Sequence, residues 1–330
     1  MDALGPATIS VSSRSDRRRA RGKRIDRFGN LLLFGVCAAA ALLAMVVLFL
    51  VGYEVVNGAQ PAISKFGLGF LTSQEWQPNF GIFGAESLLY GTLVSSFFAL
   101  LIGAPIAISI GLYLSLLAPR GIRGIVAPLV EMLAAIPSVV LGFWGILILA
   151  PFAREHFEPF LHSALGFIPI FGRPETTGSS VFTASLILTI MVIPIIASIS
   201  RDLFSAVPRE LQDGASALGA TRWEVVRGVV LPTTFSGVVA ASLLGLGRAL
   251  GEAIAVAQVI GAGSKIETSI FKTGDTLAAR IANQFPGALT ELHQSSLFYC
   301  GLILLVIGFV SNVIASWIGR RFSYDTGNMR

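Results

Sequence analysis

The chain has 330 residues, of which 54% are hydrophobic and only 13% are charged, and its mean hydropathy is +0.75. Soluble domains carry roughly a quarter of charged residues, so this composition indicates a membrane protein and excludes an ordinary soluble domain. The apolar stretches are continuous and do not alternate with polar residues, which is typical of membrane helices and not of a closed β-barrel.

The net charge of +5 raises the question of nucleic-acid binding, because Arg14–Arg27 is a dense basic run. No aromatic residue is interleaved in this run before Phe28, and an apolar segment follows it directly. A basic tail next to a membrane helix sets the orientation of that helix and contacts anionic lipid. We therefore expect membrane lipid, and not nucleic acid, as its partner.

Residues 1–27 are rich in Ser, Arg and Gly and hold few apolar side chains, which predicts a disordered basic tail. Residues 28–322 are predicted to form one transmembrane domain, and residues 323–330 a short second tail. The first apolar run is longer than the about 7 to 15 residues of a signal-peptide core and lacks a clear cleavage site, so we expect it to be retained.

Six stretches have the about 20 mostly apolar residues that a helix needs to cross the hydrocarbon core of a bilayer. They predict an all-α membrane protein with six transmembrane helices. The stretches are Leu31–Val51, Leu88–Leu117, Ile125–Ala150, Val181–Ser200, Val238–Ile260 and Leu297–Ile318.

Most of the 24 Lys and Arg residues fall on one side of these six segments, in the N-terminal tail, the linkers after the second and fourth segments, and the C-terminal end. The positive-inside rule therefore places both termini in the cytoplasm. The residues expected on the outer side are Lys65, Arg154, Arg173, Lys265, Lys272 and Arg280.

A polar island, Val207–Pro232, separates the fourth and fifth apolar segments within a predicted cytoplasmic loop at 201–232. Pro208 suits the first turn of a helix, and Gly219 can end that helix in the left-handed conformation. Thr221 and Glu224 have the spacing of a capping box at the start of a second helix. Two interpretations remain open, a docking element for a soluble partner and a well-capped connection.

Arg248 and Glu252 lie near the middle of the fifth apolar segment, where burying an Arg costs about 2.5 to 3.5 kcal/mol. Their separation of four places both on one face of a helix. Gly247 and Gly251 have the same spacing, which favours close approach of a neighbouring helix. The pair either fixes helix packing or serves a passing oxyanion, for which Arg248 offers a fork of donors that Glu252 orients. We favour the second interpretation.

Glu131 lies in the third apolar segment, ahead of Pro137 and Ser138. A proline inside a membrane helix frees a backbone carbonyl and can kink the helix. We therefore include Glu131 and Ser138 with Arg248 and Glu252 among the candidate residues of a substrate path. For Glu131 two alternatives stay open, a gating or pairing residue within the membrane and a side chain that reaches the cytoplasmic interface.

Other chemistry is not evident in the sequence. No segment has the G-x-x-x-x-G-K-[ST] pattern that cradles ATP phosphates. The three histidines, His156, His162 and His293, lack a ligand set for a metal and are expected at the surface. No nucleophile with a matching base is apparent. We expect neither an enzyme nor a bound metal or cofactor.

The polar island resembles the cytoplasmic signature of ABC importer permeases, E-A-A, three residues, G, nine residues, I, one residue, L-P. The matching positions are Asp213, Gly214, Ala215, Gly219, Val229, Leu231 and Pro232. Asp replaces Glu, Gly replaces the first Ala and Val replaces Ile. Gly214 weakens a helix by about 1 kcal/mol relative to Ala, which bears on how strongly this element couples to a partner.

Three further segments narrow the resemblance to phosphate-import permeases of the PstC type. Phe70–Pro78 with Gly91–Ser96 is similar to the external loop and second span of that family, and Gly245–Glu252 matches its charged-pair segment. With Ile136–Ser138 and the cytoplasmic loop, the resemblance extends from about Leu31 to Arg321.

The resemblance implies a permease of the type I ABC importer fold in the inner membrane of a bacterium. Its implied partners are a second permease of the PstA type, two cytoplasmic ATPase subunits that use ATP and Mg²⁺, and an external phosphate-binding protein. It also implies that Arg248 and Glu252 lie on a phosphate route. The implied ATPase-coupling residues are Glu210, Asp213, Gly214, Ala215, Gly219, Ala220 and Thr221. Permeases for sulfate or molybdate, and a self-sufficient channel or secondary transporter, remain the alternatives.

Overall fold

The computed structural model describes residues 12–175 and 177–321, which belong to two separate units that meet between Glu54 and Val55. In the first unit the described residues form the N-terminal part of one long helix, α1 (Ser12–Phe66). Every residue from 29 to 51 is exposed in this unit. Taken by itself, this part of α1 is apolar all round its circumference, as a helix in contact with lipid is.

The predicted disordered tail differs from the structure over residues 12–27, which form the first turns of α1. Arg, Lys and Ala are strong helix formers. They extend the helix of the apolar run that follows them in the chain, so no separate helix has to be nucleated. Residues 1–11 and the second predicted tail at 323–330 lie outside the described residues.

The second unit is helical throughout its described part, apart from loops and an isolated bridge between Gln77 and Ile82. After the end of α1 its helices are α2 (Glu86–Leu112), α3 (Arg120–Ala134), α4 (Ser138–Trp144), α5 (Ala150–Phe152), α6 (Glu158–Leu165), α7 (Val181–Ser205), α8 (Arg209–Ala217), α9 (Arg222–Val225), α10 (Leu231–Gly251), α11 (Ile254–Val259), α12 (Leu277–Gln284) and α13 (Glu291–Arg321). Short π-helical turns at Tyr113–Leu117, Gly145–Leu149, Ala153–Phe157 and Val226–Val230 join several of them.

Six helical segments of the described chain are long and apolar enough to cross a membrane. They confirm the predicted all-α fold with six transmembrane helices. Their bounds are Gly29–Leu71, Glu86–Leu117, Ser138–Leu165, Val181–Ser205, Arg222–Gly251 and Glu291–Ile318.

The third and fifth segments begin and end elsewhere than predicted, because the backbone breaks in the middle of both apolar stretches. Helix α3 ends at Ala134, and Pro137 precedes α4 in an extended conformation. A proline lacks the N–H that would continue the helix and disfavours helical geometry in the residue before it. Helix α10 ends at Gly251, with Glu252 extended before α11.

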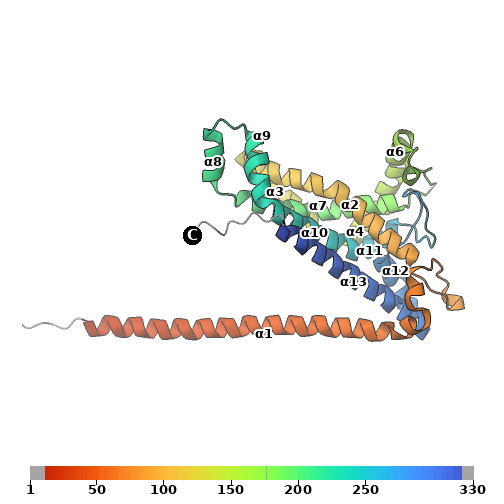
Figure 1. Ribbon diagram of the computed structural model, residues 1–330, viewed down its shortest axis with the longest axis horizontal. Helices are drawn as coiled ribbons and strands as arrows, with labels where there is room; N and C mark the ends of the chain where they lie inside the picture. Colours follow the sequence, from red (N-terminus) through yellow and green to blue (C-terminus); the bar gives the residue numbers. More distant parts are fainter. Residues whose placement is uncertain (1–11, 176, 322–330) are drawn as a thin grey trace, which may run out of the picture. The chain divides into compact units, whose positions relative to one another are not determined.

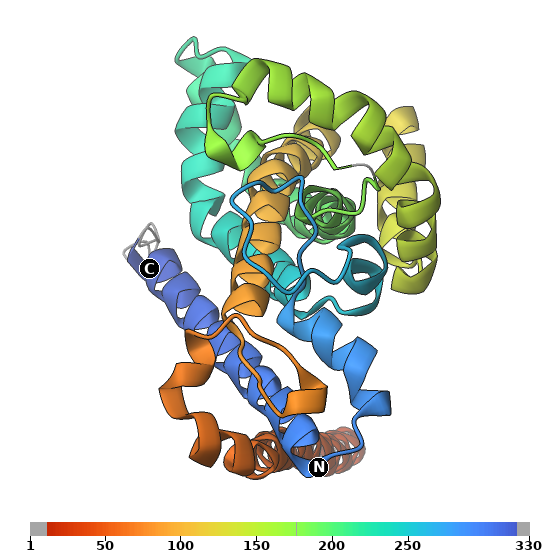
Figure 2. The same ribbon diagram turned by 90° about the vertical axis from the view of Figure 1, so that its right-hand side faces the viewer.

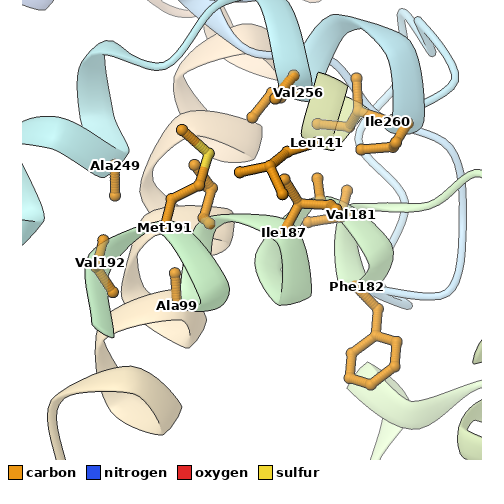
Figure 3. Packing of buried hydrophobic residues seen from close by; sticks show 14 of the residues in the cluster. Ala99, Leu141, Val181, Phe182, Ile187, Met191, Val192, Ala249, Val256 and Ile260 are labelled. Carbon is orange, nitrogen blue, oxygen red and sulfur yellow. The ribbon is translucent and has the colours of Figure 1, made fainter. Parts of the chain in front are cut away.

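Helix α7 is the centre of the second unit and appears nearly end-on, enclosed by other helices, in Figure 2. Its closest neighbour is α2, because glycines let the two backbones approach. A Cβ at Gly103 would lie 2.8 Å from Val192 Cγ2, and one at Gly111 would lie 3.0 Å from the backbone nitrogen of Arg201. Figure 3 shows the core around α7, where Ile187 and Met191 meet side chains of the two broken segments.

The short helices α4 and α11, each beginning just after a break, pack against one another. A Cβ at Gly142 would lie 3.0 Å from Ala255 Cα and 2.5 Å from Gln258 Oε1, so only glycine fits there without a shift. Leu141 and Val256 bury themselves in the same core (Figure 3). The core thus holds both breaks at a fixed place relative to α7.

A second core contains the aromatic residues of the predicted external loop. Phe70 stacks on Tyr299 with ring centroids 4.5 Å apart, and Trp76 packs edge-on against Phe83 at 5.1 Å. His293, which we expected at the surface, is buried and stacks on Phe83. Its Nε2 lies 3.0 Å from Gln284 Oε1, so an amide and an aromatic face replace the water that a surface histidine would have.

A buried ion pair joins this core to α12. Arg280 Nε lies 2.7 Å from Asp275 Oδ2, and both side chains are nearly inaccessible. The guanidinium carbon also lies 5.3 Å from the centre of the Trp76 ring, in cation–π geometry. Burial raises the pKa of the Asp275 carboxyl, while Arg280 opposes that rise.

Removing one member of this pair should destabilise the protein more than removing both. We expect Asp275→Asn to lower the free energy of unfolding by about 3 to 5 kcal/mol, because it leaves the Arg280 charge buried without its counter-charge. Adding Arg280→Met should restore most of that loss. Thermal unfolding of the detergent-solubilised variants tests this, and an additive effect of the two substitutions would contradict it.

Candidate functional site

The site is built around Arg248, in the last turn of α10. Arg248 Nη2 lies 3.9 Å from Glu252 Oε2, and the Arg248 side chain is 42% exposed while that of Glu252 is 9% exposed. The two residues form the predicted i,i+4 pair at the end of α10, where Glu252 is the C-cap residue and the chain leaves the helix after it. Glu252 Oε1 also accepts a hydrogen bond from the Ala255 amide at the start of α11, at 3.3 Å.

Glu252 thus acts on two groups, the guanidinium and an amide at the end of a helix. A carboxylate near a helix N-terminus is stabilised by the unpaired amides there. The arrangement holds Glu252 beside Arg248 without closing a tight bidentate pair. The guanidinium therefore keeps donors that Glu252 does not occupy.

A groove of about 770 Å³ opens on one side of Arg248, between α10 and α13. Hydroxyl and amide groups contribute to its wall beside apolar side chains, and Gly247 and Gly251 form part of its floor. The lining residues are Ile195, Ser236, Ala240, Leu243, Leu244, Gly247, Arg248, Gly251, Glu252, Gly308, Ser311, Asn312 and Ser316.

Within the described residues, no helix makes the close approach predicted at Gly247 and Gly251. A Cβ placed at either position would meet no heavy atom within 4 Å. The two glycines instead face the groove, so this side of α10 is left open by the chain itself.

A second, small cavity of about 90 Å³ lies on another side of Arg248. It is lined by the end of α3, the α3–α4 break, and residues of α4 and α7. Apart from the guanidinium its lining is apolar: Leu133, Ala134, Ile136, Leu141, Met191, Ile195 and Arg248. Arg248 and Ile195 contribute to both cavities, so the charge stands between the groove and the small cavity beside the proline break.

The structure brings together only some of the predicted path residues. Arg248 and Glu252 share the groove, and Ile136, next to Pro137, lines the small cavity with Arg248. Ser138 lines neither cavity. Glu131 contacts Arg201 of α7 at 2.8 Å and also lines neither of the cavities at Arg248.

The sequence analysis missed Arg201 as the partner of Glu131. Arg201 directly follows the fourth predicted span, where a positive charge is expected for topological reasons alone. Two helices that are separate in sequence bring the pair together, so no spacing rule predicts it.

The polar island forms two short helices at one end of the second unit, away from α6 at the other end (Figure 1). Gly219 has a φ of 88°. The Gly219 amide donates to Ser216 O and the Ala220 amide to Ala215 O, which closes α8 in a Schellman motif. The predicted capping box is present between Thr221 and Glu224.

The position of Pro208 differs slightly from the prediction, because Pro208 is the N-cap residue of α8 and not part of its first turn. Of the predicted coupling residues, Glu210, Asp213, Gly214, Gly219 and Thr221 are exposed, and Ala215 and Ala220 are half-buried.

Apolar side chains of this element are exposed beside those polar residues. Leu218 is 91% exposed and Trp223 is 65% exposed. Neither residue lies directly next to a predicted membrane span. Phe204, Val207 and Val230 pack beneath the element and fix it to the end of α7. A rigid base under exposed apolar side chains is typical of a docking surface.

The chain is similar to proteins of known type over nearly its whole length. Residues 103–324 match the family of binding-protein-dependent transport system inner membrane components. The phosphate transport system permease protein PstC of Mesorhizobium japonicum is 40% identical over 316 residues, which are 94% of this chain and 96% of that protein. The PstC of Pasteurella multocida is 43% identical over 272 residues, 81% and 84% of the two chains.

Solved structures of low sequence identity share the fold. A chain of a bacterial alginate ABC transporter, in complex with a periplasmic protein bound to an alginate pentasaccharide, has a TM-score of 0.59 at 19% identity. The match covers 91% of this chain and 97% of that one. A second structure of a bacterial ABC transporter that imports alginate gives 0.57 at 19% identity, over 91% and 99%.

These matches identify the predicted resemblance as common descent. A subunit of this kind is a transport component of the inner membrane that works together with other ABC subunits. The chain belongs to the family of binding-protein-dependent transport system inner membrane components and, within it, to the permeases of the PstC type.

Proposed function

We propose that this chain is the permease subunit of an ATP-driven importer of inorganic phosphate. The observation that carries the proposal is the position of Arg248, which lines both the groove between α10 and α13 and the small cavity beside the proline break. The names of the similar PstC proteins give the substrate. A fixed cation beside a cavity lowers the barrier for an oxyanion without necessarily trapping it.

The open surfaces support the partners that the resemblance implies. A second permease of the PstA type would cover the α10–α13 groove and supply its missing wall. Two ATPase subunits would hold α8 and α9 of the paired permeases. These subunits would bind ATP and Mg²⁺, for which we expect no site in this chain. An external phosphate-binding protein would deliver the anion. In this scheme both termini and the α8–α9 element are cytoplasmic, as the distribution of Lys and Arg favours.

The complex reconstituted in liposomes tests the function. Uptake of labelled phosphate that requires ATP and the binding protein supports it. Uptake by this subunit alone would favour a channel or secondary transporter, and preferential competition by sulfate or molybdate would favour a permease for another oxyanion.

Replacing Arg248 should abolish most transport without disturbing assembly. We expect Arg248→Ala to reduce phosphate uptake at least about tenfold, equivalent to about 1.4 kcal/mol on the barrier, because the guanidinium is the charge that replaces water around the anion. Arg248→Lys keeps the charge and should retain more activity. Serine-to-alanine substitution at Ser316, in the same groove, is the matched control. Normal uptake by Arg248→Ala would remove this residue from the anion route.

Gly219 should be required for coupling to the ATPase. Gly219→Val places a β-branched residue at a φ of 88°, which L-residues reach only at a cost of about 1 to 2 kcal/mol. We expect ATP hydrolysis to lose its dependence on phosphate and the binding protein, together with a fall in uptake.

Gly214 provides the matched control, because it lies inside α8 with helical backbone and open space around it. Gly214→Ala should strengthen α8 by about 0.5 to 1 kcal/mol and preserve coupling. Coupled transport by Gly219→Val, measured as phosphate imported per ATP hydrolysed, would contradict the role of the turn.

A further inference from the structure

The ion pair between Glu131 and Arg201 lies away from the cavities at Arg248, yet it links the two parts of the molecule that transport must connect. Arg201 Nη1 donates to Glu131 Oε1 at 2.8 Å. The other side of the same guanidinium holds Asp202 Oδ1 at 3.0 Å and 3.2 Å. The Arg201 side chain is 18% exposed and that of Glu131 is 50% exposed, so the guanidinium end of the contact is shielded from water and the carboxylate end is not.

The Arg201 end of this contact is rigid. The backbone of α7 at Arg201 touches α2 so closely that a Cβ at Gly111 would lie 3.0 Å from its nitrogen. A few residues further on, Phe204 and Val207 are buried in the small core that supports α8 and α9. Gln212 of α8 donates to the Val207 carbonyl at 3.2 Å. A displacement of α8 is therefore passed to the base of α7.

The Glu131 end belongs to a helix that the core holds weakly. Ala127 is the buried residue of α3, and its other described side chains are exposed or half-buried. Two polar side-chain contacts tie α3 to the end of α7 among the described residues, Glu131 to Arg201 and Arg123 Nη2 to Ser205 Oγ at 3.1 Å, and Val130 packs on the core beside them. An element with few buried contacts moves at low cost unless such ties hold it.

The end of α3 forms part of the wall beside Arg248. Leu133 and Ala134, two and three residues after Glu131 in the last turn of α3, line the small cavity together with Ile136 and Arg248. Pro137 then interrupts the helix, so α3 and α4 can change their relative angle there. A shift of Glu131 along α7 would change the shape of that cavity.

We propose that Glu131 is a positioning residue, which ties α3 to α7 so that movement of the α8–α9 element reshapes the cavity wall at Arg248. The inference rests on the function proposed above and makes Arg201 its partner. It replaces the role on the anion path that we expected for Glu131 from the sequence. The pair stays closed and acts as a strut between the docking element and the proline break.

The test measures phosphate uptake and ATP hydrolysis by the complete complex with its binding protein in liposomes. Glu131→Ala should lower the phosphate imported per ATP hydrolysed by about tenfold, within the usual range of coupling between distant sites. The phosphate concentration for half-maximal uptake should stay at the wild-type value, since Glu131 does not touch the anion. Glu131→Gln, which keeps the volume of the side chain, should act in the same direction.

Two further variants separate this role from a general loss of structure. Asp202→Asn removes the other carboxylate of Arg201 but keeps the tie to α3, so it should leave the transport ratio unchanged. Exchanging the charges in that background, Glu131→Arg with Arg201→Glu and Asp202→Asn, should restore the ratio to within about twofold of Asp202→Asn alone, because the strut is rebuilt with opposite polarity.

Several outcomes would overturn the inference. A wild-type ratio of phosphate imported to ATP hydrolysed in Glu131→Ala would do so. A changed half-saturating phosphate concentration with an unchanged ratio would also do so, because that result is expected of a residue on the anion path. If Glu131→Ala fails to assemble, the exchanged variant decides, and failure to restore the ratio there counts against the strut. The two proposals can fail separately. If the wild type imports phosphate, Arg248→Ala does not, and Glu131→Ala behaves like the wild type, the strut is rejected and the proposed function stands.

Discussion

The site depends on one constraint, that peptide groups surrounded by lipid must find hydrogen-bond partners within the protein. Interrupted helices are tolerated at membrane depth only where the freed groups are enclosed by protein or line a cavity. Here both interruptions, before Ser138 and after Gly251, line a cavity: Ala134 and Ile136 line the small cavity at Arg248, and Gly251 and Glu252 line the groove. The position of Arg248 follows from this arrangement, since α10 has to end beside a space where a polar group is needed.

A helix end also explains why the charged pair is not a closed salt bridge. Residues four apart lie on one face of a helix, as Arg248 and Glu252 do. Because the chain leaves the helix after Glu252, its carboxylate also reaches the Ala255 amide, and its second oxygen lies 3.9 Å from the guanidinium. Glu252 thereby compensates the charge of Arg248 without occupying all its donors. A fully satisfied pair would have little tendency to exchange partners with an anion.

Much of this could be predicted from local patterns in the sequence, and what could not depends on contacts between distant segments. Hydropathy predicted six spans, and Gly219 with Thr221 and Glu224 predicted the form of the α8–α9 element, because turn and cap chemistry acts over a few residues. Hydropathy could not locate the breaks, since Ile125–Ala150 and Val238–Ile260 are apolar on both sides of them. The partner of Glu131 and the burial of His293 arise only when helices pack. The residue roles on the anion route remain predictions.

The exposed Leu218 at the tip of the α8–α9 turn has a consequence for the fate of an unassembled subunit in the cell. With 91% of its surface accessible, it stays in contact with water until another subunit of the transporter covers it. Chaperones and proteases recognise apolar groups of this kind. A copy that finds no other subunit therefore keeps an apolar group that quality control can recognise.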